Sequence, residues 1–335
     1  MKNPPTVSVC IPTYNRAQML KESLESVLNQ EFEDFELIIS DNASEDETSS
    51  VVGAFGDWKI RYVRNRRNMG QLHNWNQCLN LARGKYVTIL PDDDVMMADN
   101  LQAKVELLSR NPHVGLVHSK YHIIDHEGRI VRENTNWGHG ADRTSDVVER
   151  GHDVLAAMLL TSNMVNAPTV LFRRACYERL GGFTRQLSLA FDWEYWMRIA
   201  VHYDIAFLAR PLIKWRLHSG TLTSQHVYGG GNTLTLTALR EELAAKRLVL
   251  KRYHHTIENG RDLKGRAMRE KISRIVARGE EMLGDSGPNL EARRFVLDMC
   301  WAFPEILLDK RVWKVLLKSI LSRSSIETLK RISPI

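Results

Sequence analysis

The chain has 335 residues, a length that fits one large domain with an appendage, or two domains. Hydrophobic residues make up 43% and charged residues 26%, which is ordinary for a globular protein and excludes a disordered, collagen-like or coiled-coil chain. The apolar runs are too short for a membrane-spanning helix, and the N-terminal segment lacks the features of a signal peptide. The four cysteines are scattered without metal-binding spacing, which favours reduced thiols and a cytoplasmic protein.

The net charge of +6 is unevenly distributed along the chain. Residues 232–335 contain 21 Lys and Arg against 13 Asp and Glu, a net charge of +8, whereas residues 1–231 carry 25 against 27, or −2. The shift predicts a boundary near Gly229–Gly231, between a domain at 1–230 and a basic region at 231–335. A basic region of this kind meets an anionic membrane surface or a nucleic acid, or is simply a solvated helical face.

Short apolar strands alternate with amphipathic helices along the first part of the chain. The predicted elements, in order, are strand 7–11, helix 17–28, strand 35–40, a short helix after Asp46, strand 60–63, helix 72–82, strand 85–90, helix 101–110, strand 114–119, strand 168–173 and helix 192–202. Residues 232–335 are helical almost throughout. This alternation predicts an α/β fold with a mostly parallel sheet, in which ligands bind beyond the carboxyl ends of the strands.

Three polar clusters follow predicted strands, at Thr13–Asn15, at Asp41–Asn42 and at Asp92–Asp94. In the last of these, three adjacent carboxylates repel one another, by about 1–4 kcal/mol per pair at ~4 Å. A divalent cation removes that cost, and oxygen ligands suit Mg²⁺ or Mn²⁺. The alternative is a solvated acidic loop that caps the next helix. The position level with the other two polar strand ends favours the cation.

Two further acids are candidates for chemistry. Asp41 ends a buried strand, where its carboxylate can accept a hydrogen bond from a nucleobase ring N–H or serve as a turn residue. Asp192 and Glu194 flank Trp193. A carboxylate beside aromatic rings suits a sugar cleft and a general base with a raised pKa, although the same pattern fits an amphipathic helix with core tryptophans.

Other motifs point in fewer directions. His218 and Arg216 follow a predicted strand, where an imidazole is more often structural than a metal ligand and an arginine pairs with phosphate or forms a surface salt bridge. The sequence has no G-x-G-x-x-G after a strand, no P-loop and no G-x-S-x-G. Dinucleotide dehydrogenases, P-loop NTPases and α/β-hydrolases are therefore excluded.

Several of these segments, in this order, resemble family 2 glycosyltransferases of the GT-A fold. The resemblance spans roughly residues 5–225 and rests on Val7–Arg16, Ser40–Asp46, Asn68–Gly70 with Asn74–Asn76, Gly84–Asp94, Gly181–Phe183 with Asp192–Trp193, and Arg216–Gly220. Two positions depart from the common pattern. Pro91 stands where many members have Asp, so the register of the metal-binding DxD motif is open. Phe191 stands where many members have Glu before the catalytic Asp, which leaves Asp192 as the better base.

The resemblance implies a role for each matching residue. Pro12, Thr13, Tyr14, Asn15 and Asp41 would line the nucleobase and ribose pocket, with Asn68 and Asn74 near the donor. Asp93, then Asp92 and Asp94, would hold Mn²⁺ or Mg²⁺, with His218 approaching it, and Asp92 and Asp93 would contact the donor. Asp192 would be the catalytic base, with Glu194 in reserve, and Trp193 would face the acceptor.

The implied reaction is transfer of a sugar from a nucleotide-diphospho-sugar, UDP-sugars first, to an acceptor hydroxyl with inversion. The setting implied is cell-surface polysaccharide or glycolipid synthesis, with a saccharide or lipid-linked acceptor and no nucleic acid. The rival hypotheses are a nucleotidyltransferase and a non-catalytic nucleotide-sugar or glycan-binding module. On a predicted helix at 310–322, Trp313 and Leu317 share a face flanked by Lys310, Lys314 and Lys318, which suits peripheral contact with the inner face of a membrane or packing on the core.

Overall fold

The computed structural model describes residues 4–135, 143–220, 235–283 and 289–320. It divides the chain into two compact units, Met1–Glu258 and Asn259–Ile335. The division falls later than the composition boundary near residue 230, because helix α8 (Leu236–Tyr253) packs on helix α7 (Phe191–Ala200) in the first unit. Glu241 of α8 accepts hydrogen bonds from the backbone N–H groups of Ser188 and Leu189, just before α7.

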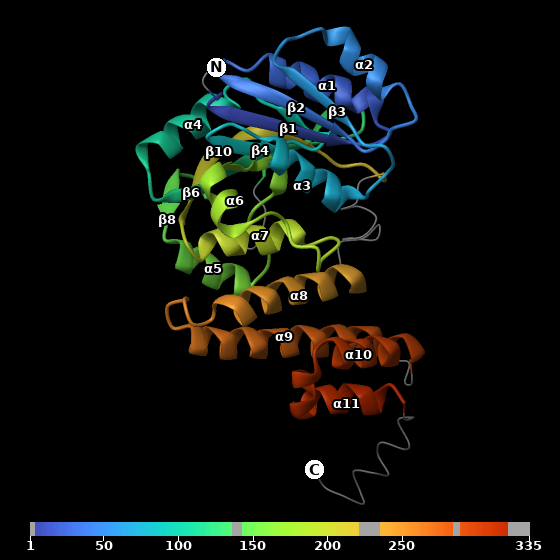
Figure 1. Ribbon diagram of the computed structural model, residues 1–335. Helices are drawn as coiled ribbons and strands as arrows, with labels where there is room; N and C mark the ends of the chain where they lie inside the picture. The colour runs from blue at the N-terminus through green and yellow to red at the C-terminus, as the bar shows by residue number, and fades with distance from the viewer. Residues whose placement is uncertain (1–3, 136–142, 221–234, 284–288, 321–335) are drawn as a thin grey trace, which may run out of the picture. The chain divides into compact units, whose positions relative to one another are not determined.

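The first half of this unit is a run of strands and helices in alternation (Figure 1). Its elements are β1 (Val7–Thr13), α1 (Ala17–Leu28), β2 (Phe35–Asp41), α2 (Thr48–Phe55), β3 (Ile60–Arg64), α3 (Gln71–Leu81), β4 (Tyr86–Ile89), β5 (Val95–Met96) and α4 (Asn100–Arg110). β1 and β2 are buried along their whole length, as their continuous apolar runs predict. The strand and helix order expected from the sequence is confirmed here.

The second half is less regular. Its elements are β6 (Val114–Ile124), β7 (Ile130–Thr135), β8 (Val147–Glu149), α5 (Gly151–Leu160), the 3₁₀ turn η1 (Ala167–Thr169), β9 (Leu171–Arg173), α6 (Arg174–Leu180), α7 and β10 (Asp204–Arg216). The strand predicted at 168–173 is wrong at its start, since Pro168 lies in η1 and the strand begins at Leu171. The strand predicted at 114–119 continues to Ile124 because it pairs with β10 along most of its length.

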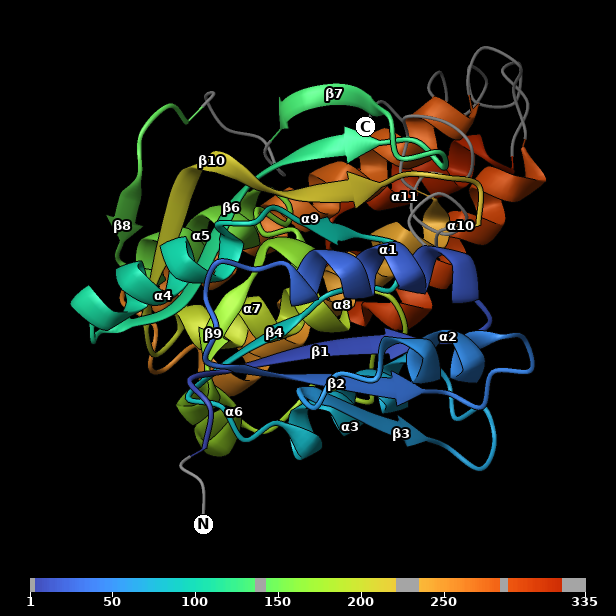
Figure 2. The same ribbon diagram turned by 90° about the horizontal axis from the view of Figure 1, so that it is seen from above.

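These strands form one sheet in the order β3-β2-β1-β4-β9-β6-β10-β5, with β7 beside β6 and β8 beside β10. The pairs β3–β2, β2–β1, β1–β4 and β6–β10 are parallel, and β9 joins β4 to β6 in the antiparallel direction. Helices α1 and α2 cover one face, and α3, α6 and α7 cover the other (Figures 1 and 2). The carboxyl ends of β1, β2 and β4 therefore meet at one edge, which is where a ligand site forms in such sheets.

The second unit contains α9 (Gly260–Leu283), α10 (Leu290–Ala302), the 3₁₀ helix η3 (Pro304–Leu308) and α11 (Lys310–Lys318). Its core includes Ile275, Phe295, Phe303 and Val315. Across the part of the chain that the structure describes, no helix has both the length and the apolar composition needed to cross a bilayer. The helical region predicted after residue 232 is confirmed over its described residues.

Candidate active site

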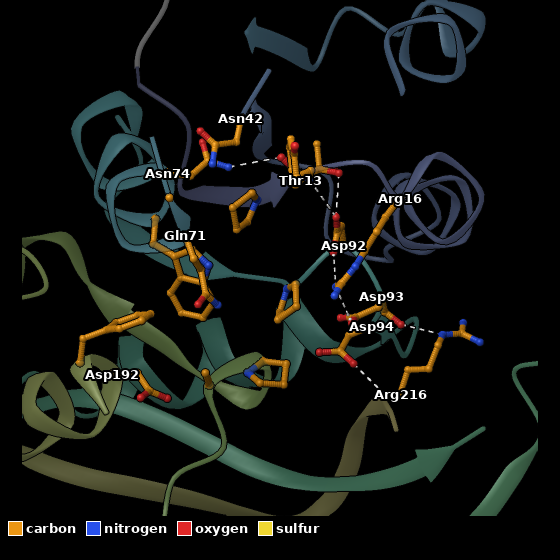
Figure 3. A pocket seen from close by; sticks show the side chains of 18 of the residues that line it. Thr13, Arg16, Asn42, Gln71, Asn74, Asp92, Asp93, Asp94, Asp192 and Arg216 are labelled. Atoms are coloured by element: carbon orange, nitrogen blue, oxygen red, sulfur yellow. Dashed lines mark hydrogen bonds and ion pairs between the residues drawn. The ribbon is translucent and has the colours of Figure 1, made fainter. Parts of the chain in front are cut away.

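A cavity of about 390 Å³ opens at the carboxyl ends of β1 and β4 (Figure 3). It is lined by Pro12, Thr13, Tyr14, Arg16, Asn42, Asn68, Gly70, Gln71, Asn74, Trp75, Pro91, Asp92, Asp93, Asp94, Asn166, Ala167, Pro168, Leu189, Phe191, Asp192, Trp215 and Arg216. Polar side chains from the strand ends form one side of it. Asp192 and residues from the second half of the first unit form the other.

The acidic triplet Asp92–Asp94, directly after β4, is buried and anchored rather than solvated. The Thr13 hydroxyl donates to Asp92 Oδ2 at 2.7 Å, and the Arg216 backbone N–H donates to Asp94 Oδ1 at 2.7 Å. The Ser23 hydroxyl, from α1, bonds the carbonyl oxygens of Asp92 and Asp94 and so fixes the turn that carries the three carboxylates. The solvated-loop alternative is therefore wrong.

The surroundings of the triplet disfavour the simultaneous ionisation of its carboxyl groups. Burial and the neighbouring Asp93 raise the pKa of Asp92 to about 6, although the Arg16 guanidinium and the Thr13 hydroxyl act in the opposite direction. Burial and Asp93 also raise the pKa of Asp94 well above its ordinary value. Asp94 Oδ2 is buried and has no hydrogen-bond partner. A cation that binds among these buried carboxyl groups would stabilise their ionised forms.

Nitrogen atoms of two side chains, Arg16 and His218, approach the same oxygen of the triplet. Arg16 Nη1 lies 2.7 Å from Asp93 Oδ2 and 3.0 Å from Asp92 Oδ1, and His218 Nε2 lies 3.4 Å from Asp93 Oδ2. The structure thus brings His218 to the triplet, as the resemblance implied. Among the described residues, however, no three His, Cys, Asp or Glu side chains already converge in the manner of a metal-ligand group.

The side chain of Arg216 supports the turn that carries the triplet. Its side chain is fully buried, and its Nε donates to the carbonyl oxygen of Asp93 at 2.8 Å. Its other nitrogens donate to the carbonyl oxygens of Asp125 and His126 and to Glu22 Oε2. The prediction that Arg216 forms a surface salt bridge is therefore wrong. Its guanidinium is buried and connects β10 to α1 and to the acidic turn.

Amide side chains form another part of the cavity wall on the strand-end side. Asn74 is buried and donates to the carbonyl oxygen of Ser40 at 2.7 Å, while its Oδ1 accepts from the Ser40 hydroxyl. Asn68 Oδ1 accepts from Asn42 Nδ2 at 2.7 Å and from the Gly70 N–H at 2.8 Å. Gly70 has φ +84°, which an L-residue adopts only with strain, so a glycine suits this entry to α3.

Two residues expected in the nucleotide pocket lie behind its wall. Asp41 is fully buried and accepts from the Tyr62 hydroxyl at 2.5 Å and from the Ser44 N–H at 2.8 Å. Asn15, with φ +52°, uses its side chain to accept from the Glu45 N–H at 2.7 Å. Neither lines the cavity. In the conformation described, Asp41 and Asn15 instead hold in place the loops whose residues line the cavity.

Asp192 lies across the cavity from the triplet (Figure 3). It occupies the first turn of α7, and its Oδ1 accepts from the Trp193 N–H at 2.9 Å. Burial raises its pKa to about 7, against the opposing effect of that hydrogen bond. A carboxyl with a pKa near neutrality, facing a cavity, is suited to proton transfer. An aromatic cluster fixes α7, with Phe191 packed edge-on at 5.3 Å from Trp75 and 5.4 Å from Phe183.

The neighbours of Asp192 face elsewhere. Glu194 is buried and forms a salt bridge with Arg198, with Glu194 Oε2 at 2.7 Å from Arg198 Nη2, and it does not line the cavity. Trp193 is also absent from the lining, and Trp196 is a core residue. The indoles that line the cavity are those of Trp75, from α3, and Trp215, from β10. The structure therefore brings Asp192, but neither Glu194 nor Trp193, to the site.

Comparisons with known proteins identify the family. The model of glycosyl transferase family 2 matches residues 8–174. The chain belongs to this family. It is 28% identical to an uncharacterized glycosyltransferase of Methanocaldococcus jannaschii over 64% of this chain and 71% of that protein. It is 33% identical to the Campylobacter jejuni GalNAc(5)-diNAcBac-PP-undecaprenol beta-1,3-glucosyltransferase over 44% of this chain and 47% of that enzyme.

Solved structures share the fold of this family 2 glycosyltransferase. Crystal structures of S. aureus TarS 1-349 superpose with TM-scores of 0.64 in complex with UDP-GlcNAc and 0.60 without it. Sequence identity in the UDP-GlcNAc complex is 17%, with 93% of this chain and 84% of that chain covered. The GT-A fold predicted from the sequence is confirmed.

Several lining residues of the glycosyltransferase had no role assigned to them from the sequence. They include Arg16, Asn42 and Gln71 on the strand-end side and Asn166, Pro168 and Leu189 near Asp192. Arg16 and Asn42 adjoin predicted site residues, so the strand-end pattern pointed to their neighbourhood. Gln71 and Asn166 carry no local signal, because only the packing of distant segments brings them to the cavity.

Proposed function

We propose that this glycosyltransferase is an inverting enzyme that transfers a sugar from a nucleotide-diphospho-sugar to an acceptor hydroxyl, with Asp192 as the general base. One observation carries the proposal: the Asp192 carboxyl, with a pKa of about 7, faces the same cavity as the acidic triplet from the opposite side. A base on one side and the leaving diphosphate on the other suit direct displacement, which inverts the anomeric carbon.

UDP-sugars are the first donors to consider. TarS, which has the same fold, was crystallised with UDP-GlcNAc. In our proposal the nucleotide lies among Pro12, Thr13 and Tyr14, with Asn68 and Asn74 near the donor. Asp41 accepts the ring N–H of uracil only if the Tyr62 hydroxyl, now 2.5 Å from Asp41 Oδ2, yields that position or shares it.

The acidic turn fits a divalent cation by its donor chemistry. Carboxylate oxygens are the ligands that Mn²⁺ and Mg²⁺ prefer, and Asp94 Oδ2 is buried without a hydrogen-bond partner. We propose that Asp93, assisted by Asp92, Asp94 and His218, holds such an ion. When bound, the ion would offset the negative charge that develops on the leaving diphosphate.

The chain's own groups perform the remaining steps. Asp192 accepts the proton of the acceptor hydroxyl as that oxygen attacks the anomeric carbon. Trp75, Phe191 and Trp215 line the same cavity as Asp192, and aromatic rings suit the apolar surface of a sugar ring. The Campylobacter relative is named for a lipid-linked acceptor, so we propose a saccharide or lipid-linked saccharide in cell-surface polysaccharide or glycolipid synthesis.

A turnover assay tests this function and separates it from its rivals. Purified protein with Mn²⁺ is incubated with a panel of UDP-, dTDP- and GDP-sugars, and nucleotide diphosphate release is measured with and without simple glycoside acceptors. Transfer predicts release of the nucleoside diphosphate and a product of inverted configuration by NMR. A nucleotidyltransferase instead releases pyrophosphate from a nucleoside triphosphate and a sugar 1-phosphate. Thermal stabilisation by a donor without any turnover would indicate a binding module and contradict the proposal.

We also propose that the second unit contacts an anionic membrane surface. Trp301 and Leu308 are 89% and 93% exposed, and Trp313 and Leu317 of α11 are about half exposed beside Lys310 and Lys314. Exposed aromatic and aliphatic side chains next to cations match the interface of an anionic bilayer.

Vesicle co-sedimentation checks this surface. The double variant Trp313→Ser/Leu317→Ser should bind phosphatidylglycerol vesicles about tenfold more weakly than the wild type, because each change removes an apolar side chain that inserts into the interface. Trp58→Ser is the matched control, since Trp58 is a 79% exposed tryptophan in the other unit. Equal binding by all three proteins would contradict the membrane contact.

A further inference from the structure

The guanidinium that contacts the carboxylates of the acidic triplet belongs to Arg16, which follows β1 on the strand-end side of the cavity. The Arg16 side chain is 29% exposed, whereas those of Asp92 and Asp93 are 6% and 8% exposed. Its Nη1 bridges the two carboxylates at 3.0 Å and 2.7 Å. Asp93 Oδ2, the oxygen that it contacts most closely, also lies 3.4 Å from His218 Nε2. Arg16 thus lies where a divalent ion held by Asp93 and His218 would lie.

The position of Arg16 is fixed from three directions. Its Nη2 donates to the carbonyl oxygen of Gly220 at 3.0 Å, two residues after His218. The preceding residue, Asn15, is held by Ser44 and Glu45, and the following N–H, of Ala17, donates to Asp46. The guanidinium is therefore a built part of the site rather than a solvent-exposed side chain that happens to be near it.

The charges decide what this arrangement does to cation binding. A guanidinium remains protonated at every physiological pH, so its positive charge cannot be removed by titration. A divalent ion that binds Asp93 Oδ2 must displace Arg16 Nη1 from that oxygen or remain close to it, and like charges at contact distance repel strongly. The donor diphosphate, which enters the same cavity, is an anionic partner for the displaced guanidinium.

We propose that Arg16 is the resident counter-ion of the acidic triplet and competes with the divalent cation for Asp93 Oδ2. Arg16 thereby lowers the affinity for the cation alone and makes cation binding depend on the arrival of a diphosphate. This role rests on the cation site proposed above. The proposal goes beyond that site because Arg16, which is not itself a metal ligand, would control the affinity of the site for the cation.

Titration calorimetry of the full chain with Mn²⁺ alone tests the proposal. The Arg16→Gln variant keeps a side chain of similar size without the charge and should bind Mn²⁺ at least tenfold more tightly than the wild type. Arg16→Lys keeps the charge and should stay within about threefold of the wild type. Arg83→Gln is the matched control, because Arg83 pairs with the buried Glu36 at 2.7 Å and does not line the cavity. It should leave Mn²⁺ binding unchanged.

Several outcomes would overturn the role of Arg16. They are equal or weaker Mn²⁺ binding by Arg16→Gln, equally tightened binding by Arg16→Lys, or no Mn²⁺ binding by the wild type and Arg16→Gln alike. If Arg16→Gln does not fold, as shown by circular dichroism, Arg16→Met replaces it with the same expectation. Sugar transfer by the wild type is measured in parallel. Turnover without the Arg16 effect leaves the proposed function standing, and the effect without turnover leaves the counter-ion role standing.

Discussion

Replacement of Asp192 by asparagine should lower kcat about 10³-fold, within the range of general-base contributions, while the donor dissociation constant stays within about twofold. Asparagine preserves the shape and a hydrogen bond to the Trp193 N–H but cannot accept a proton from the acceptor. Donor affinity should persist because Asp192 lies across the cavity from the strand ends that form the proposed donor side. Nucleotide diphosphate release and calorimetry with the donor measure the two quantities separately.

Glu194→Gln is the matched control for Asp192→Asn, because it makes the same chemical change two residues away. Glu194 is paired with Arg198 in the interior, and removal of one partner of a buried pair costs about 3–5 kcal/mol. Its main effect should therefore be a lower melting temperature rather than a lower kcat of the folded protein. A large loss of kcat in Glu194→Gln, with full activity in Asp192→Asn, would transfer the role of base to Glu194.

Replacement of Arg216 by methionine should lower the free energy of unfolding by about 3–5 kcal/mol, because the buried guanidinium loses several hydrogen bonds, each of which contributes about 1.5–3 kcal/mol. The substitution removes the guanidinium donors from the carbonyl oxygens of Asp93, Asp125 and His126 and the cationic partner from Glu22. The acidic turn also loses its side-chain support from β10, although the backbone N–H of residue 216 still reaches Asp94, so we expect weaker Mn²⁺ binding in the fraction that folds. Urea unfolding followed by circular dichroism measures the stability change.

Arg210→Met provides the comparison for Arg216→Met. Arg210 lies on the same strand but is 53% exposed, and it pairs with the 38% exposed Asp99. Exposed pairs contribute about 0–1 kcal/mol, so this variant should unfold close to the wild type. Similar unfolding curves for the two variants would show that the buried contacts of Arg216 do not stabilise the fold.

The sequence predicted the sheet edge and the acids on it because both follow from local pattern. Continuous apolar runs place β1 and β2 in the interior, and the polar residues after them must then emerge at the carboxyl edge. Helical periodicity over 192–202 placed Asp192 at the start of a helix, where the structure has it. The predicted bounds of these helices and strands differ from the observed bounds by only a residue or two, except for β6 and β9.

The partners of these acids could not be predicted because they depend on contacts between distant segments. Arg16 donates to the carbonyl oxygen of a residue 204 positions away, and Arg216 reaches back to Glu22 over 194 positions. The spacing of apolar residues in the sequence does not indicate which distant residue the end of such a long side chain contacts. The same limit explains why Trp193 was predicted to face the acceptor, whereas the indoles that line the cavity belong to Trp75 and Trp215.

The pH dependence of kcat/KM tests the central claim that Asp192 is the base. The base must be unprotonated to accept a proton, and burial raises the pKa of Asp192 to about 7. kcat/KM should therefore rise about tenfold per pH unit between pH 5 and pH 6.5 and level off above pH 7.5, at saturating Mn²⁺. A profile that is flat across this range, or that falls as the pH rises, would contradict the assignment.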